Sequence, residues 1–161
     1  MSIQSELLHI QASIPKHVTL VAVSKTKPNH MIEACYEAKQ RHFGENKVQD
    51  LVDKYNTLPK DIKWHYIGHL QTNKVKYIAP FVHLIHAVDS IKLLKEINKQ
   101  ALKNNRVINV LLQFHIAEET SKFGLTKDTC LNLLHSEDYV LMKNINIVGV
   151  MGMATFTDSD N

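Results

Sequence analysis

The segment Val-Thr-Leu-Val-Ala-Val-Ser at residues 18–24 is a compact apolar run, rich in β-branched side chains, between Pro15 and Pro28. Such a run, bounded by residues that interrupt regular structure, is typical of a buried strand. From Pro28 to Gln40, apolar side chains recur at the spacing of one helical face, and proline suits the first position of a helix. The segment therefore predicts a β/α unit near the N-terminus.

The same alternation continues along the chain. Short apolar segments predict further strands, and the stretches between them have helical periodicity. The expected strands are 41–44, 64–68, 82–88, 107–116 and 145–154; the expected helices are an amphipathic one within 1–15, then 46–55, 91–102, which Ser90 can cap, and 127–135. Alternating strands and helices favour a parallel α/β architecture.

Two parallel folds fit this pattern. A closed (β/α)8 TIM barrel needs eight units and commonly has about 250 residues, whereas this chain has 161 residues and about six expected strands. The pattern therefore predicts either an incomplete barrel or an open sheet of the flavodoxin type, and periodicity alone does not separate them. In either case we expect one domain over residues 1–161.

The composition argues against several classes of protein. With 44% hydrophobic and 22% charged residues the chain fits one globular domain, and its net charge of +3 comes from scattered lysines and arginines, so nucleic-acid binding is not expected. No window approaches the roughly 20 apolar residues of a membrane span. Cys35 and Cys130 lie outside any CxxC motif and fit reduced thiols. We expect a cytoplasmic protein without membrane contact.

A lysine stands at the C-terminal end of the first expected strand, where parallel folds place functional residues. Side chains alternate along a strand, so Val21, Val23 and Lys25 share one face, and Ser24 on the other face cannot form a dyad with Lys25. If the valines line the interior, the Lys25 amine is partly desolvated, which favours the neutral form that attacks an aldehyde. Lys27 would add a second positive charge beside it. A lysine that ends a strand is also commonly a solvated surface charge, and the residues alone leave both interpretations open.

Five further features occur in the order and spacing of one family. They are VAVSKTKP at 21–28, FGEN at 43–46 with Gln49 following, WHYIGHLQTNK at 64–74, HAVDS at 86–90 and SKFG at 121–124. These segments resemble the pyridoxal-phosphate homeostasis proteins of the YggS/PROSC type, and the resemblance extends from about residue 18 to residue 154. It implies a barrel like the N-terminal domain of alanine racemase, with pyridoxal 5'-phosphate (PLP) bound as a Schiff base on Lys25.

The resemblance also implies which residues border the cofactor. Asn46 follows the second strand, His69 the third and Lys122 the fifth, and Met151 lies near the end of the sixth. The full set of expected cofactor-binding residues is Lys25, Val23, Lys27, Asn46, His69, Lys122 and Met151. No catalytic residue is expected.

Several of these residues have an alternative structural role. Asn46 equally fits the cap of the following helix, Lys122 a loop lysine, and Met151 simple core packing. His65 and His69 have the spacing of metal ligands on a helix, but a strand and a glycine turn occupy these positions, so no metal is expected there.

Members of the family continue with two more β/α units, whose Ser- and Gly-rich loops hold the cofactor phosphate. No comparable glycine-rich cradle occurs within these 161 residues. We therefore expect a C-terminally truncated barrel that binds PLP weakly and whose uncovered edges favour self-association.

The family implies a PLP carrier or buffer that performs no turnover, serves PLP-dependent apoenzymes and is monomeric when full length. One alternative is a PLP-dependent enzyme of fold type III, such as an amino-acid racemase, which needs a second base on the opposite face of the cofactor. A second alternative is a remnant that binds no PLP.

Overall fold

The computed structural model describes residues 2–116 and 124–154, and within them six parallel strands form one sheet. Each strand pairs with its neighbour in sequence, so the sheet order is β1-β2-β3-β4-β5-β6. The strands are β1 (Ala22–Val23), β2 (His42–Glu45), β3 (Lys63–Tyr66), β4 (Leu84–Val88), β5 (Ile108–Phe114) and β6 (Ile145–Gly152).

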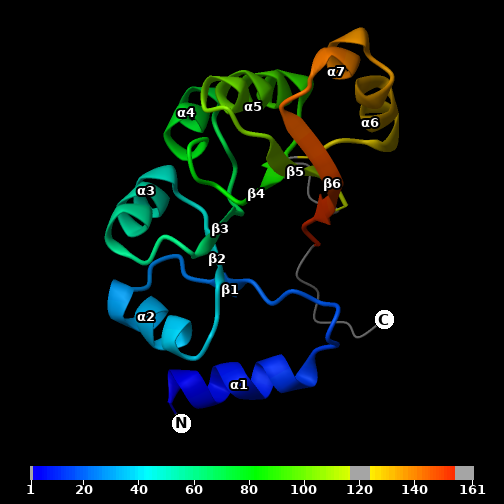
Figure 1. The fold of residues 1–161 in the computed structure, drawn as a ribbon. Helices are drawn as coiled ribbons and strands as arrows, with labels where there is room; N and C mark the ends of the chain where they lie inside the picture. The colour runs from blue at the N-terminus through cyan, green and yellow to red at the C-terminus, as the bar shows by residue number, and fades with distance from the viewer. Residues whose placement is uncertain (1, 117–123, 155–161) are drawn as a thin grey trace.

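This strand order separates the two folds that the sequence left open. A flavodoxin-type sheet has the order 2-1-3-4-5 and reverses direction at a switch point, whereas a barrel adds each strand beside the previous one. The observed order is that of a barrel. Figure 1 shows the sheet curving with its helices on the outer side, and β1 and β6 are the two edges of the described part of this partial barrel.

Helices connect the strands and cover the outer face of the sheet (Figure 1). They are α1 (Ile3–Ser13), α2 (Asn29–Glu37), α3 (Val48–Thr57), the 3-10 turn η1 (Thr72–Lys74), α4 (Val75–Ile78), α5 (Ile91–Lys103), α6 (Lys127–Leu134) and α7 (Glu137–Leu141). The expected cap of α5 is confirmed, because the Ser90 hydroxyl accepts a hydrogen bond from the Leu93 amide at 3.2 Å. None of the helices in residues 2–116 and 124–154 is long and apolar enough to cross a membrane.

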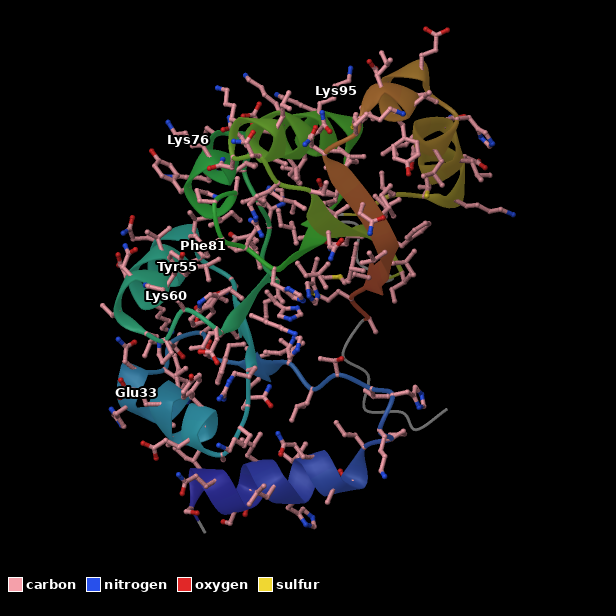
Figure 2. The ribbon with its side chains drawn as sticks, in the orientation of Figure 1. Glu33, Tyr55, Lys60, Lys76, Phe81 and Lys95 are labelled. Carbon is pink, nitrogen blue, oxygen red and sulfur yellow. The ribbon has the colours of Figure 1, made fainter. Side chains whose placement is uncertain are left out.

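The hydrophobic core lies between the sheet and the helices. Phe43 of β2 and Trp64 of β3 are almost completely buried there, with ring centroids 6.0 Å apart. Nearer the surface, Tyr55 of α3 stacks on Phe81 at a centroid distance of 3.8 Å (Figure 2). Because side chains alternate along a strand, the residues beside Phe43 and Trp64 face the opposite, inner side of the sheet.

The first strand is shorter than the sequence predicts. Of residues 18–24, only Ala22 and Val23 form the ladder with β2. The Gln40 side-chain amide donates hydrogen bonds to the carbonyl of Leu20 at 2.8 Å and to that of His42 at 2.6 Å. The Leu20 carbonyl is therefore satisfied by a side chain, whereas in a longer strand it would pair with the backbone of β2. The prediction of the strand was right in place and wrong in length.

Two short helices were missed. α4 and α7 contain four and five residues, which is too few for helical periodicity to show in the sequence.

Candidate functional site

Lys25 is exposed and lies directly beyond β1, at the C-terminal edge of the sheet. A tight turn places it there: the Lys27 amide donates to the Ser24 carbonyl at 3.0 Å, and Thr26 has a φ of +63°. The partial desolvation expected for the amine is therefore not seen in the described residues. The reason is that Lys25 belongs to the turn and does not extend the strand.

Ser24 points away from Lys25 into a buried polar network. Its hydroxyl donates to Glu45 Oε1 at 2.6 Å, and Lys54 Nζ binds the same carboxylate oxygen at 2.6 Å and the Ser24 carbonyl at 2.8 Å. Glu45 is completely buried, and Lys54 is 8% exposed. The ion pair between Glu45 of β2 and Lys54 of α3 thus holds the backbone next to Lys25 in place. The buried position of Ser24 agrees with the predicted alternation of side chains along the strand.

Asn46 and His69 are brought together by a tyrosine. The Tyr66 hydroxyl lies 3.1 Å from the Asn46 carbonyl and 3.1 Å from the His69 carbonyl, so it ties the loop after β2 to the loop after β3. The His69 ring lies beside Asp89, which follows β4, with 3.5 Å between Nδ1 and Oδ2. Three successive strand ends therefore contribute polar groups to one edge of the sheet.

A cleft of about 470 Å³ opens beside this pair of loops. Its wall includes the polar side chains of Gln49, Gln71 and Lys74. The lining residues are Asn46, Lys47, Val48, Gln49, Val52, Tyr66, His69, Gln71, Lys74 and Tyr77. Asn46 is not the N-cap residue of α3, because that position is Lys47, whose side chain makes no cap hydrogen bond.

The remaining expected cofactor-binding residues lie at separate places. Val23 is 52% exposed on the edge strand β1, and Met151 is half-buried near the end of the other edge strand, β6. Lys27 lines a different cleft, of about 260 Å³, together with Asp50 and Asp53. Lys122 lies outside the described residues.

The contact between the two loops depends on a glycine. A Cβ added at Gly68 would lie 2.3 Å from the Asn46 carbonyl oxygen and 2.8 Å from its Cα. We expect Gly68→Ala to displace the Asn46 loop and to lower the free energy of unfolding by about 1 to 3 kcal/mol, as overpacking does. Urea unfolding checks the energy, and the NMR signals of the Asn46 amide check the displacement.

Gly149→Ala is the matched control, because its Cβ would meet only Leu111 Cδ2, at an ordinary 3.4 Å. A stability loss of equal size in both variants would show that the loop contact at Gly68 has no special role.

Sequence reasoning missed Glu45, Lys54 and Tyr66 as supports of this edge. Glu45 lay within the FGEN segment, but nothing in the sequence indicates that α3 returns Lys54 to it nine residues later. The contacts of the Tyr66 hydroxyl with the Asn46 and His69 carbonyls could not be predicted either, because they leave no periodic pattern in the sequence. Such contacts come from the docking of a helix on a sheet.

Comparisons with known proteins agree with the geometry. The model of the family described as "Alanine racemase, N-terminal domain" matches residues 2–161. A pyridoxal phosphate homeostasis protein of Aquifex aeolicus is 38% identical over 87% of this chain and 61% of its own length. Another, from Synechocystis, is 36% identical over 93% of this chain and 67% of its own length. The chain thus spans roughly 60% of the first of these relatives.

Solved structures of similar proteins have the same fold as this chain. PipY from Synechococcus elongatus, without PLP, superposes with a TM-score of 0.88 at 31% identity, over 98% of this chain and 74% of PipY. PipY with PLP bound gives 0.84 at 30% identity, over 97% and 72%. An alanine racemase of Clostridium difficile, with a TM-score of 0.74 and 9% identity over 93% of this chain and 39% of its own, supports the fold alone.

Proposed function

Because the chain belongs to the pyridoxal phosphate homeostasis proteins, within the family of the alanine racemase N-terminal domain, we propose that it binds PLP through Lys25. The observation that carries the proposal is the position of this amine: it is exposed at the C-terminal end of β1, at the edge where Asn46 and His69 meet. Barrels of this kind place their sites at that edge.

The residues present fit the cofactor. PLP supplies an aldehyde that reacts reversibly with a primary amine, together with an anionic phosphate. Lys25 offers the amine, and the buried bonds of Ser24 hold the adjoining backbone in place. Asn46 and His69, joined through Tyr66, offer hydrogen-bonding groups at the neighbouring strand ends. We propose that Val23, Lys27, Lys122 and Met151 complete the surroundings of the cofactor.

We propose a carrier without turnover. The relatives at 36–38% identity are named pyridoxal phosphate homeostasis proteins. The alanine racemase, at 9% identity, supports the fold alone and not a racemase activity. A carrier needs a reversible bond and an accessible amine, and the exposure of Lys25 meets the second requirement. The recipients would be PLP-dependent apoenzymes, and we propose that the protein is a monomer when full length. The free thiols of Cys35 and Cys130 fit a reducing compartment such as the cytoplasm.

The test is an absorption titration of the purified chain with PLP, before and after borohydride reduction. We expect a visible band whose reduced adduct maps by peptide mass spectrometry to Lys25, and we expect Lys25→Ala to lose at least about tenfold in affinity, which is about 1.4 kcal/mol. Lys92→Ala, which removes another exposed lysine, on α5, is the control and should behave like the wild type.

A parallel titration with pyridoxal, which lacks the phosphate, measures how much the anion contributes. If Lys25→Ala and the wild type bind PLP equally, or if the adduct spreads over several surface lysines, the proposed function is wrong. Stronger binding of PLP than of pyridoxal would show that the chain also recognises the phosphate.

A further inference from the structure

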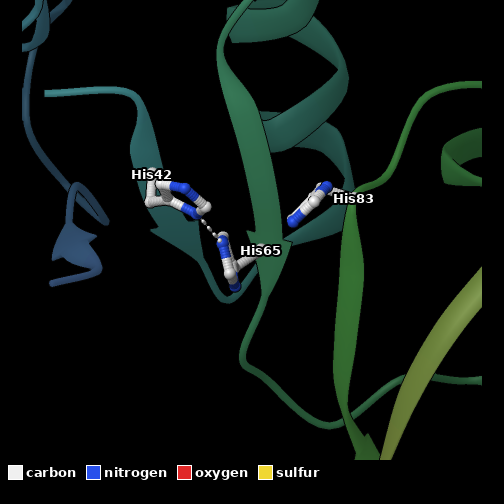
Figure 3. A group of neighbouring side chains, drawn as sticks. All are labelled: His42, His65 and His83. Carbon is white, nitrogen blue, oxygen red and sulfur yellow. Dashed lines mark hydrogen bonds between the residues drawn. The ribbon is translucent and has the colours of Figure 1, made fainter. Parts of the chain in front are cut away.

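Three histidines from neighbouring strands meet on the inner face of the sheet (Figure 3). His42 is the first residue of β2, His65 is the third residue of β3, and His83 immediately precedes β4. One ring nitrogen from each lies within 4.8 Å of the other two. His42 and His83 stand at the N-terminal ends of their strands, and His65 lies inside β3 in register with Gly44, whereas Lys25 lies beyond the C-terminal end of β1.

The spacing of these nitrogens suits a small cation. Zn²⁺ bonds imidazole nitrogen at about 2.0 to 2.1 Å, so two such ligands of a tetrahedral ion lie about 3.3 Å apart. His42 Nδ1 and His65 Nε2 are 2.8 Å apart and share a hydrogen bond, which a bound ion would replace. His42 and His83 are only partly buried, so rotation of their rings can close the remaining separation.

His65 is already oriented as a metal ligand would be. It is 3% exposed, and its second nitrogen, Nδ1, lies 2.8 Å from Nε2 of His86 in β4. In the tautomer in which His65 Nδ1–H donates to His86, the Nε2 lone pair faces His42. Ligand histidines commonly use their other ring nitrogen in this way, which fixes both ring orientation and tautomer.

The surroundings keep the imidazoles neutral. Burial lowers the pKa of His42, His65, His83 and His86, and that of His65 falls to about 3. A neutral ring is the form that binds metal near neutral pH. Lys63 also acts on the first three rings, and Arg106 acts on His83. These two cations oppose a divalent ion, and the cluster contains no carboxylate to offset them.

We propose that His42, His65 and His83 form a binding site for a divalent first-row transition metal ion, with water as the fourth ligand. Imidazole donors suit Zn²⁺, Ni²⁺ and Cu²⁺ rather than Mg²⁺ or Ca²⁺. The site shares no residue with the proposed PLP site, although His65 is in register with Val23 through Gly44.

The test uses the whole chain, treated with a chelator and then titrated with Zn²⁺ by calorimetry in the absence of PLP. We expect one ion per chain. His42→Gln and His83→Gln should each weaken binding at least tenfold, because each removes one of three donors. His30→Gln, at an exposed position of α2, is the matched control, and Lys25→Ala should bind like the wild type.

A second measurement covers the case in which a variant fails to fold. Nitrogen-15 NMR of the ten histidines in the wild-type chain should show Zn²⁺ shifting the ring nitrogens of His42, His65 and His83, with smaller changes elsewhere. Unchanged binding in a folded His42→Gln/His83→Gln double variant overturns the proposal. So does the absence of stoichiometric binding, since the rings would then serve only to fill the inner face of the sheet.

Discussion

Lys54→Met is expected to lower the free energy of unfolding by about 3 to 5 kcal/mol, the usual effect of removing one partner from a buried ion pair. The Glu45 carboxylate is completely buried, and Lys54 Nζ lies 2.6 Å from its Oε1. After the substitution only the Ser24 hydroxyl remains bound to that oxygen, and Oε2 already accepts no hydrogen bond within the described part of the chain. Denaturant unfolding at neutral pH measures the loss.

Lys95→Met is the matched control, because its ion pair with Asp138 is also 2.6 Å long but both side chains are about half exposed (Figure 2). Exposed pairs contribute about 0 to 1 kcal/mol, so this variant should remain close to the wild type. The Glu45→Leu/Lys54→Met double variant should recover much of the loss, since replacing both charges leaves none uncompensated. Equal losses from Lys54→Met and Lys95→Met would contradict the role assigned to the buried pair.

The chain is expected to lose stability steeply below about pH 6.5, in metal-free buffer. Burial lowers the pKa of four clustered histidines, most strongly His65, from 6.5 to about 3. Between these values the unfolded chain binds a proton at His65 that the folded chain does not. Unfolding is therefore favoured as the pH falls through this window, with a slope approaching about 1.4 kcal/mol per pH unit for this group.

Urea unfolding between pH 7.5 and 4 checks this slope. His65→Gln should flatten the pH dependence by the contribution of one histidine, while His30→Gln, at an exposed position, should leave it unchanged. The absolute stability of the two variants is not the readout; only the change of slope is. A pH dependence that is the same in His65→Gln and the wild type would mean that the buried ring does not control acid unfolding.

Much of the fold could be predicted from the sequence, because the β/α alternation depends on local periodicity. The strands at 41–44, 64–68 and 107–116 all appear with small changes in their ends, and so does the helix at 91–102. The choice between a barrel and an open sheet could not be made from periodicity, because strand order is a non-local property. The family resemblance favoured the barrel, and the pairing of successive strands confirmed it.

The site was less predictable. Placing Lys25 at a strand end needed only the pattern of the first strand, but its exposure depends on the turn made by Thr26. The meeting of Asn46 with His69 depends on Tyr66 and on the absence of a side chain at Gly68. The spacing of His65 and His69 did not predict a metal site, and the structure gathers His65 with histidines of other strands.

The sequential order of the sheet also bears on how the chain acquires its structure. Every strand from β2 to β6 docks on the strand synthesised immediately before it, so none must wait for a distant segment. Each pairing joins strands that are separated by a single β/α unit, which lets structure grow from the N-terminus as the chain leaves the ribosome. The ion pair of Glu45 with Lys54 becomes available once α3 has formed and then holds the first two strands while the rest is still being made.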